Sequence, residues 1–169
     1  MNLFIKILIT LIITALGIYP YIGTNNIPGA LDALHSFGII PAIILIIVFF
    51  IAIGFYCKSL QTTLELIKPE NRKANPKSVW LMFLIPYNFF EDFFIMINIS
   101  NSLEEEFKIN DKLKDVKDFG LITGLGWATA QVLSFFPNEI GQISGLIGLV
   151  LWIKHWLFIN KINQKLIHI

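Results

Sequence analysis

The sequence predicts an all-α integral membrane protein with four transmembrane helices, and three observations lead to this fold class. The 169 residues have a mean hydropathy of +0.68 and are 55% hydrophobic, whereas soluble domains are typically about 45–50% apolar. Four stretches approach the roughly 20 apolar residues that a spanning helix needs. The cationic residues are gathered in segments that would all lie on one side of a bilayer, which is the positive-inside pattern.

The predicted spans lie within a single membrane domain, 1–169, and the third of them is short. They are residues 3–22, 38–57, 119–136 and 140–159. Within the first span, Ala15-Leu16-Gly17 loosely resembles a signal-peptide cleavage site. Lys6 lies inside the apolar stretch, however, so we expect a helix that is retained instead of a signal that is removed.

The segregation of charge gives the orientation. All thirteen Lys and Arg residues fall in four patches, namely Lys6, 58–77, 108–117 and 154–165. The runs 23–38 and 137–142 contain no cation. Because the cytoplasmic loops of multi-pass proteins carry the excess of Lys and Arg, we expect both termini in the cytoplasm. The chain has 31 isoleucines against 5 valines and 12 lysines against 1 arginine. This bias favours an AT-rich bacterial genome, and hence the bacterial inner (cytoplasmic) membrane.

Residues 79–100 are long enough to cross the bilayer, yet their middle contains Pro86, Asn88, Glu91 and Asp92. An acidic residue at the centre of a spanning helix costs about 2.5–3.5 kcal/mol on insertion scales. A crossing here would also divide the cations six on one side and seven on the other, whereas without it all thirteen lie on one side. We therefore expect a re-entrant or interfacial helical element on the cytoplasmic face.

Local sequence signals predict where helices begin and end in this region. Asn75-Pro76 predicts an N-cap followed by proline at the first helical position, and Pro86 predicts the end or a kink of that short helix. A helix wound from Asn88 gathers most of its polar side chains on one arc and its phenylalanines on the other. Ser102-x-x-Glu105 fits a capping box, so a new helix is expected to begin there.

The two cytoplasmic segments 58–67 and 101–118 have apolar residues at helical spacing with charged residues between them. The first stripe consists of Leu60, Leu64 and Ile67, and the second of Leu103, Phe107, Leu113 and Val116. We expect amphipathic cytoplasmic helices in both segments. They are either solvated surface helices or a docking surface for a protein partner.

The last two spans are expected to form a hairpin that turns at Pro137-Asn138-Glu139. Each span carries a pair of glycines at the spacing that lets helix backbones approach closely, namely Gly120 with Gly124 and Gly141 with Gly145. Antiparallel pairing predicts aromatic or bulky partners for both pairs. They are Trp156 and Trp152 for the first pair, and Val132, Phe135 and Phe136 for the second.

The candidate ion, proton or polar site is the polar arc of the 79–100 element together with one residue of the last span. It consists of Asn88, Glu91, Asp92, Asn98 and His155, with Lys154 as a further candidate partner. Ionisable groups at membrane depth are functional hypotheses by default, and carboxylates beside a histidine suit proton relay or cation binding. The alternative is that both carboxylates face cytoplasmic headgroups and reach water.

The sequence contains no enzyme signature. It has no His-Glu-x-x-His, no Gly-x-Ser-x-Gly and no phosphate-binding glycine-rich loop. The single Cys57 excludes an intramolecular disulfide and a thiolate metal cluster. Asp32, His35 and Glu139 could hold a divalent metal, but nothing in their spacing requires one. We expect no catalysis, no cofactor and no metal site, and the spread of the cations gives no reason to expect nucleic-acid binding.

Several segments of residues 75–169 resemble a recurring pattern in a family of small bacterial multi-pass membrane proteins of uncharacterised function. They are Asn75-Pro76-x-x-Val79-Trp80-Leu81, Ile85-Pro86-x-Asn88, Ser102-Leu103-x-x-Glu106-Phe107 and Leu149-Val150-Leu151-Trp152-Ile153-x-x-Trp156. The resemblance implies a membrane class and no activity. Members of the family tend to be uncharged where Glu91 and Asp92 stand here.

Two functions follow as hypotheses. The first is a non-catalytic accessory protein of the inner membrane, which binds a protein partner or lipid through its amphipathic cytoplasmic segments. The alternative is a small transporter or channel, formed by one chain or by an oligomer, in which the re-entrant segment lines a path and the Glu91-Asp92 pair is the site. A defined partner in a pull-down would favour the first, and flux in reconstituted vesicles would favour the second.

Overall fold

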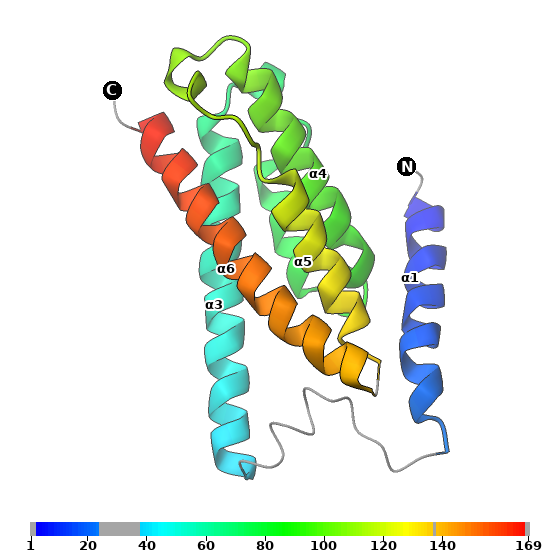
Figure 1. Cartoon of the computed structure of the whole chain (residues 1–169). Helices are drawn as coiled ribbons and strands as arrows, with labels where there is room; N and C mark the ends of the chain where they lie inside the picture. The colour runs from blue at the N-terminus through cyan, green and yellow to red at the C-terminus, as the bar shows by residue number, and fades with distance from the viewer. Residues whose placement is uncertain (1–2, 24–37, 137, 168–169) are drawn as a thin grey trace.

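A computed structural model describes residues 3–23, 38–136 and 138–167 of the chain (Figure 1). Within these ranges the structure is entirely helix and loop, so the all-α prediction is confirmed for the described residues. The α-helices are α1 (Leu3–Ile18), α3 (Ile39–Leu66), α4 (Asn88–Phe107), α5 (Leu121–Leu133) and α6 (Glu139–Ile167). The 3₁₀ helices are η1 (Tyr19–Tyr21), η2 (Pro69–Asn71), η3 (Pro76–Phe83) and η4 (Asp111–Leu113).

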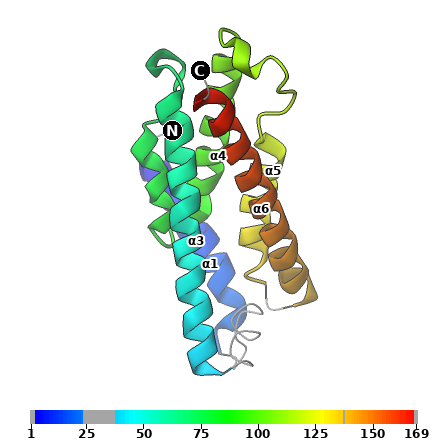
Figure 2. The same cartoon turned by 90° about the vertical axis from the view of Figure 1, so that its left-hand side faces the viewer.

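Helices α1 and α6 place both ends of the described chain at the same end of the molecule, which is uppermost in Figure 1. We call this the proximal end, and the opposite end, where α3 and α6 begin, the distal end. Figure 2 shows α4 beside the proximal half of α3, while the distal half of α3 extends beyond α4. The large apolar side chains of that distal half, from Ile39 to Ile51, are exposed.

Segments η3 and α4 form a hairpin that starts and ends at the proximal end. Three contacts show that η3 runs antiparallel to α3: the Cys57 thiol lies 3.6 Å from the Val79 carbonyl; Trp80 donates to Gln61; and Phe83 packs on Phe50. Helix α4 then returns beside α3. Asn75 accepts a hydrogen bond from the Lys77 amide and Pro76 begins η3, so the predicted N-cap is confirmed.

Three helices are long and apolar enough to cross a membrane, namely Phe4–Tyr21, Ile39–Leu66 and Glu139–Ile167. The fourth predicted span, 119–136, contains α5, which has only 13 residues. At 1.5 Å per residue such a helix is roughly 20 Å long, short of the ~30 Å hydrocarbon thickness. The chain before it, 116–119, is not helical, and Gly120 precedes α5 in a left-handed conformation with a φ of 78°. The described residues therefore provide three candidate spans.

The apolar stripes of the two amphipathic segments are buried in the chain's own core. Leu60, Leu64 and Ile67 are at most 1% exposed, and so are Leu103 and Leu113. The second segment differs from its prediction in two respects. Helix α4 continues to Phe107 without a break, so Ser102 lies inside a helix instead of capping one, and its hydroxyl donates to the Asn98 carbonyl at 2.6 Å. After Phe107 the segment contains only the short η4, so 108–118 does not form the expected amphipathic helix.

Helix α4 buries most of the polar side chains of its arc and leaves its phenylalanines partly exposed. Asn88, Glu91, Asp92 and Ser102 are buried, together with the isoleucines that lie among them, while the four phenylalanines of 89–94 are partly exposed. A helix in water shows the opposite distribution. Polar residues that face the protein interior with apolar residues outside are typical of helices at membrane depth.

The glycines of the α5–α6 hairpin allow close packing, but mostly against other partners than the predicted ones. A methyl group added at Gly124 would lie 2.8 Å from the sulfur of Met96 on α4, and one at Gly120 would lie 2.7 Å from the Phe158 ring. Gly141 packs on the backbone of Phe136, which is one of its predicted partners. A methyl group added at Gly145 would have ordinary contact with its nearest neighbour, the Ser134 Cβ, at 3.7 Å. The tryptophans are absent from these contacts because they surround a tyrosine of α3 instead.

Replacing Gly124 with leucine should lower the melting temperature in mild detergent. The added side chain would displace Met96 and separate α4 from α5, and overpacking of this kind typically costs about 1–3 kcal/mol. Gly145→Leu is the matched control, since that position is half-exposed and has room for a larger side chain. A second substitution, Met96→Ala, should restore part of the loss in the Gly124 variant. Equal melting temperatures for wild type and Gly124→Leu would contradict the contact.

Candidate functional site

The first turns of α4 bring three polar residues into the interior. Asn88, Glu91 and Asp92 are 5%, 6% and 1% exposed, although the chain has only just left the turn that contains Pro86. Asn88 and Asp92 are four residues apart, so they lie on the same face of the helix. Both carboxylates are thus buried within the protein, which differs from the alternative in which they face headgroups and reach water.

Glu91 is paired with the one cation of α1. The Lys6 ammonium lies 2.7 Å and 2.9 Å from the two carboxylate oxygens of Glu91, and 4.7 Å from the centre of the Phe94 ring. Buried charges persist in proteins when they are paired in this way. The pair ties α1 to α4 and leaves Glu91 without a free charge.

Asp92 has no such partner. Its Oδ1 atom and the Oδ1 atom of Asn88 are both buried without a hydrogen-bond partner among the described residues. Asp92 lies one helical turn before Met96, whose sulfur is 3.5 Å from the Tyr56 hydroxyl of α3. An unpaired charge is costly in buried surroundings, so Asp92 differs from the neighbouring Glu91 in lacking a cation beside it.

Tyr56 and His155 form a hydrogen-bonded pair between α3 and α6. The Tyr56 hydroxyl lies 2.7 Å from the His155 Nδ1 atom and 3.5 Å from the Met96 sulfur. Both rings are buried, at 0% and 1% exposure. A tight contact of α5 with α6 covers the opposite edge of the imidazole, because a methyl group at Gly120 would lie 3.1 Å from His155 Nε2.

An aromatic shell encloses Tyr56. The ring centres of Trp127, Trp152 and Trp156 lie 5.7, 5.8 and 6.1 Å from that of Tyr56, two of them edge-on at more than 80°. Trp152 Nε1 is buried without a partner, and Trp156 donates to Ser59 at 3.0 Å. The tryptophans thus exclude water and fix the tyrosine against the histidine.

Asp92, Tyr56 and His155, with Asn88 one turn away, constitute the candidate functional site, which we call the buried acid cluster. The sequence identified Asn88, Asp92 and His155 but missed Tyr56. The one available signal was a tyrosine at the end of an apolar run in a chain that also carries four tryptophans. Two other predicted members lie elsewhere, since Asn98 is half-buried on another face of α4 and Lys154 is exposed.

The cluster combines three kinds of side chain that can exchange protons. It contains a carboxyl group, a phenol and an imidazole, which are groups that proton pathways through membranes use. No three His, Cys, Asp or Glu residues within 3–23, 38–136 and 138–167 lie close enough together to hold a metal ion. Asp32 and His35 of the outer-loop metal hypothesis lie outside the described residues.

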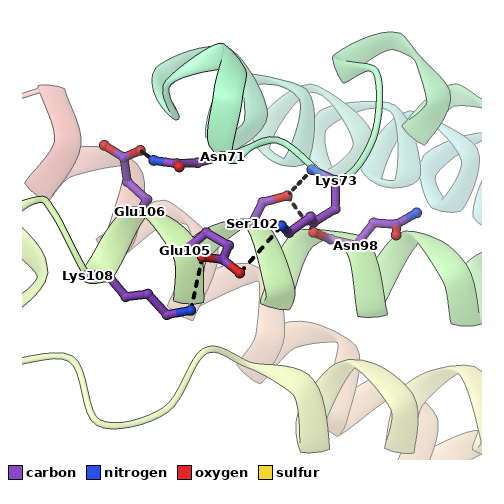
Figure 3. A network of polar contacts seen from close by, with 7 residues as sticks. All are labelled: Asn71, Lys73, Asn98, Ser102, Glu105, Glu106 and Lys108. Atoms are coloured by element: carbon purple, nitrogen blue, oxygen red, sulfur yellow. Dashed lines mark hydrogen bonds and ion pairs between the residues drawn. The ribbon is translucent and has the colours of Figure 1, made fainter.

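A second polar network holds the hairpin to the proximal end of α3 (Figure 3). The buried Glu106 carboxylate accepts from the Lys68 amide at 3.2 Å, from Asn71 at 2.8 Å and from Asn110 at 2.9 Å. The Ser102 hydroxyl oxygen accepts from the Lys73 amide at 2.8 Å. Ser102 and Glu106 belong to one of the segments that resemble the bacterial family, and here they fix the 67–73 loop.

No protein-family model, curated protein or solved structure significantly matches this chain.

Proposed function

We propose that the chain is a multi-pass protein of the bacterial cytoplasmic membrane, with both termini in the cytoplasm and the η3–α4 hairpin inserted as a re-entrant element. All thirteen cationic residues lie in the proximal half, on the first turn of α1, the second halves of α3 and α6, and the loops between. This distribution supports a cytoplasmic proximal end. The buried polar arc of α4 supports a position of the hairpin within the bilayer.

The depth of the hairpin follows from its register with α3. Lys58 is exposed and marks the level of the cytoplasmic interface. Phe83, at the end of η3, packs on Phe50, which lies eight residues further into α3. At 1.5 Å per residue the tip of the hairpin would reach about 12 Å below the interface. A helical hairpin can enter to this depth without crossing, because its backbone groups are satisfied within the protein.

Thiol labelling of intact cells tests this topology. Cysteine at Asn138, an exposed position at the distal end, should react with a membrane-impermeant reagent added outside, and we expect the same at Thr24 from the charge pattern. Lys112→Cys, at the proximal end, should react only after the cells are permeabilised. The native Cys57 is fully buried and should give little background. Labelling of Lys112→Cys from outside would mean that the 79–100 element crosses the membrane.

We further propose that the protein is a small transporter in which Asp92 takes up and releases a proton or another small cation. The observation that carries this proposal concerns Asp92, which is 1% exposed and lacks a hydrogen-bond partner at Oδ1. It lies one helical turn from Met96, which contacts Tyr56 of the Tyr56–His155 pair. An acid buried for packing alone would have its oxygens satisfied. We assign no covalent chemistry to the protein.

Access to the cluster is proposed from the cytoplasmic side. His155 adjoins Gly120, and the Gly120 amide donates to the exposed Asp118 at 3.0 Å. Asp118 is also close enough to His155 to interact with it electrostatically. The proposed route therefore runs from the solvent at the proximal end past the exposed Asp118 and Gly120 to the imidazole. On the other side, the residues around the hairpin tip are apolar, so release toward the distal end would need the tip to move.

Reconstitution of the purified protein into vesicles with an internal pH indicator tests the transport proposal. An imposed pH gradient, or a gradient of sodium or potassium, should dissipate faster than in vesicles without protein. Dependence on sodium or potassium would identify the ion, and dependence on pH alone would identify the proton. Equal rates with and without protein, for all three gradients, would contradict transport.

The accessory role is the second candidate, and the network of Figure 3 is the observation that favours it. The apolar stripes that suggested a docking surface are buried. Glu106 and Ser102 instead fix the 67–73 loop beside α4. The surface there carries charged side chains, among them Lys73, which is paired with Glu105 at 3.4 Å. A rigid charged surface suits a protein partner. Under this role a defined partner should co-purify after mild extraction, and no flux should be seen.

A further inference from the structure

We propose that the cleft beneath the tip of the hairpin binds one acyl chain of a bilayer phospholipid. The cleft has a volume of about 470 Å³, which is within the range of roughly 300–1,000 Å³ that is usual for small-ligand sites. Three parts of the chain form it: the distal half of α1 with η1, the hairpin tip with the first turn of α4, and the end of α5. In Figure 1 these parts lie side by side on the right of the molecule.

The lining of the cleft has no polar group to offer a ligand. Its walls include Ile13 and Gly17 of α1, Pro86 and Phe89 of the hairpin, and Phe135 after α5. The lining also contains a threonine, Thr14, but its hydroxyl donates to the Thr10 carbonyl at 2.8 Å. A cavity without polar partners does not hold ordered water. An empty one loses dispersion contacts along all of its walls. Hydrocarbon is the occupant that these walls accept.

The position of the cleft identifies the source of the hydrocarbon. Residues 13–20 form the distal half of the candidate span Phe4–Tyr21, so the cleft lies at the depth of lipid tails. Its rim is open sideways, because Leu16 and Ile85 are 64% and 57% exposed. Tyr21 donates to the Phe135 carbonyl and so ties η1 to the end of α5 at the distal side.

A phospholipid fits this site better than a free fatty acid does. The residues that line the cleft include no charged side chain, so the carboxylate of a fatty acid would have no partner. The headgroup of a phospholipid can stay at the bilayer surface while one of its chains enters the cleft from the side. The cleft is therefore assigned to a lipid tail that remains with the protein, separate from the buried acid cluster and independent of the transport proposal.

Photo-crosslinking in nanodiscs tests the site. The full-length protein is reconstituted with phosphatidylcholine that carries a diazirine in one acyl chain, or with a diazirine-labelled palmitic acid, and the modified peptides are identified by mass spectrometry. The phospholipid probe should label peptides that contain residues 13–20 and 85–89 more strongly than the freely exposed distal half of α3. Labelling by the fatty acid alone would overturn the phospholipid assignment.

Filling the cleft provides the control. Gly17→Phe should place a ring in the cleft and abolish most of the labelling there, while Ala15→Phe, on an exposed position of the same helix that does not line the cleft, should leave it unchanged. Val132→Phe fills the cleft from the opposite wall, in case the Gly17 variant does not fold. Labelling that is equal on the cleft and on the distal half of α3, and unchanged in the filled variants, would show only ordinary surrounding lipid and would overturn the proposal.

Discussion

Asp92→Asn is expected to abolish ion flux in reconstituted vesicles while the protein remains folded. The amide has nearly the same size as the carboxyl group but cannot exchange a proton at neutral pH. Its NH₂ group can also donate to a neighbouring acceptor such as Asn88, whose Oδ1 has no partner in the native protein. The melting temperature should therefore stay close to that of the wild type. The measurement is the rate of collapse of the ion gradient at a fixed protein-to-lipid ratio.

Glu91→Gln is the matched control for Asp92→Asn. The two carboxyl groups are adjacent in sequence, but Glu91 is already neutralised by Lys6 at 2.7 Å. Its substitution should weaken the docking of α1, because a partly buried ammonium loses its partner, and should leave flux measurable. Flux that is lost in Glu91→Gln but retained in Asp92→Asn would contradict the assigned site. Flux retained in a variant that carries both Glu91→Gln and Asp92→Asn would exclude both carboxylates.

Glu106→Ala is expected to destabilise the protein by about 2–4 kcal/mol, because it leaves several donors without an acceptor in a buried place. The carboxylate is 1% exposed and binds the Lys68 amide, Asn71 and Asn110. Thermal unfolding in mild detergent measures the loss. Glu104→Ala, two positions away and exposed, should change the melting temperature little. Similar melting temperatures for the two variants would contradict the role of the network.

The same carboxylate should make the protein sensitive to acid. Burial opposes ionisation of Glu106, but the hydrogen bonds from Asn71, Asn110 and the Lys68 amide outweigh it and lower its pKa below the usual value of 4.5. A group with a lowered pKa stabilises the folded state above its unfolded pKa, and this contribution is lost as the pH falls through the folded pKa. The gap in stability between wild type and Glu106→Gln should therefore be full above about pH 5 and shrink below pH 4.5. A gap that does not change down to pH 3 would contradict this account.

The sequence by itself predicted three apolar helices long enough to cross a membrane. Mean hydropathy and stretches of about 20 apolar residues are properties of the chain alone, and the predicted spans 3–22, 38–57 and 140–159 correspond to α1 with η1, α3 and α6. Such stretches do not show where a helix begins. The helix expected from residue 119 begins only at Leu121, after Gly120 in its left-handed conformation, where Gly120 packs against α6.

For the η3–α4 hairpin, too, the sequence predicted local features but not those that depend on tertiary contacts. Charge counting predicted that 79–100 returns to the side it started from, and the Asn75-Pro76 cap and the start of α4 at Asn88 followed from local preferences. The capping box at Ser102 failed for a tertiary reason. Leu103 and Glu106 are buried in the tertiary structure, and this burial favours a continuous helix. The Ser102 hydroxyl oxygen accepts a hydrogen bond from the Lys73 amide, which lies in another part of the chain.

Only the tertiary structure decided which polar groups meet. Hydrophobic periodicity tells which face of a helix is buried but not which helix covers it. It thus could not predict that the two adjacent carboxylates have different surroundings. Glu91 faces α1 and pairs with Lys6, whereas Asp92 lies one turn from Met96, which contacts Tyr56. Adjacent residues on a helix point about 100° apart, so two neighbouring carboxyl groups enter different surroundings. One becomes half of an ion pair and the other an unpaired acid in the interior, and that difference comes from the packing of α4 between α1 and α3.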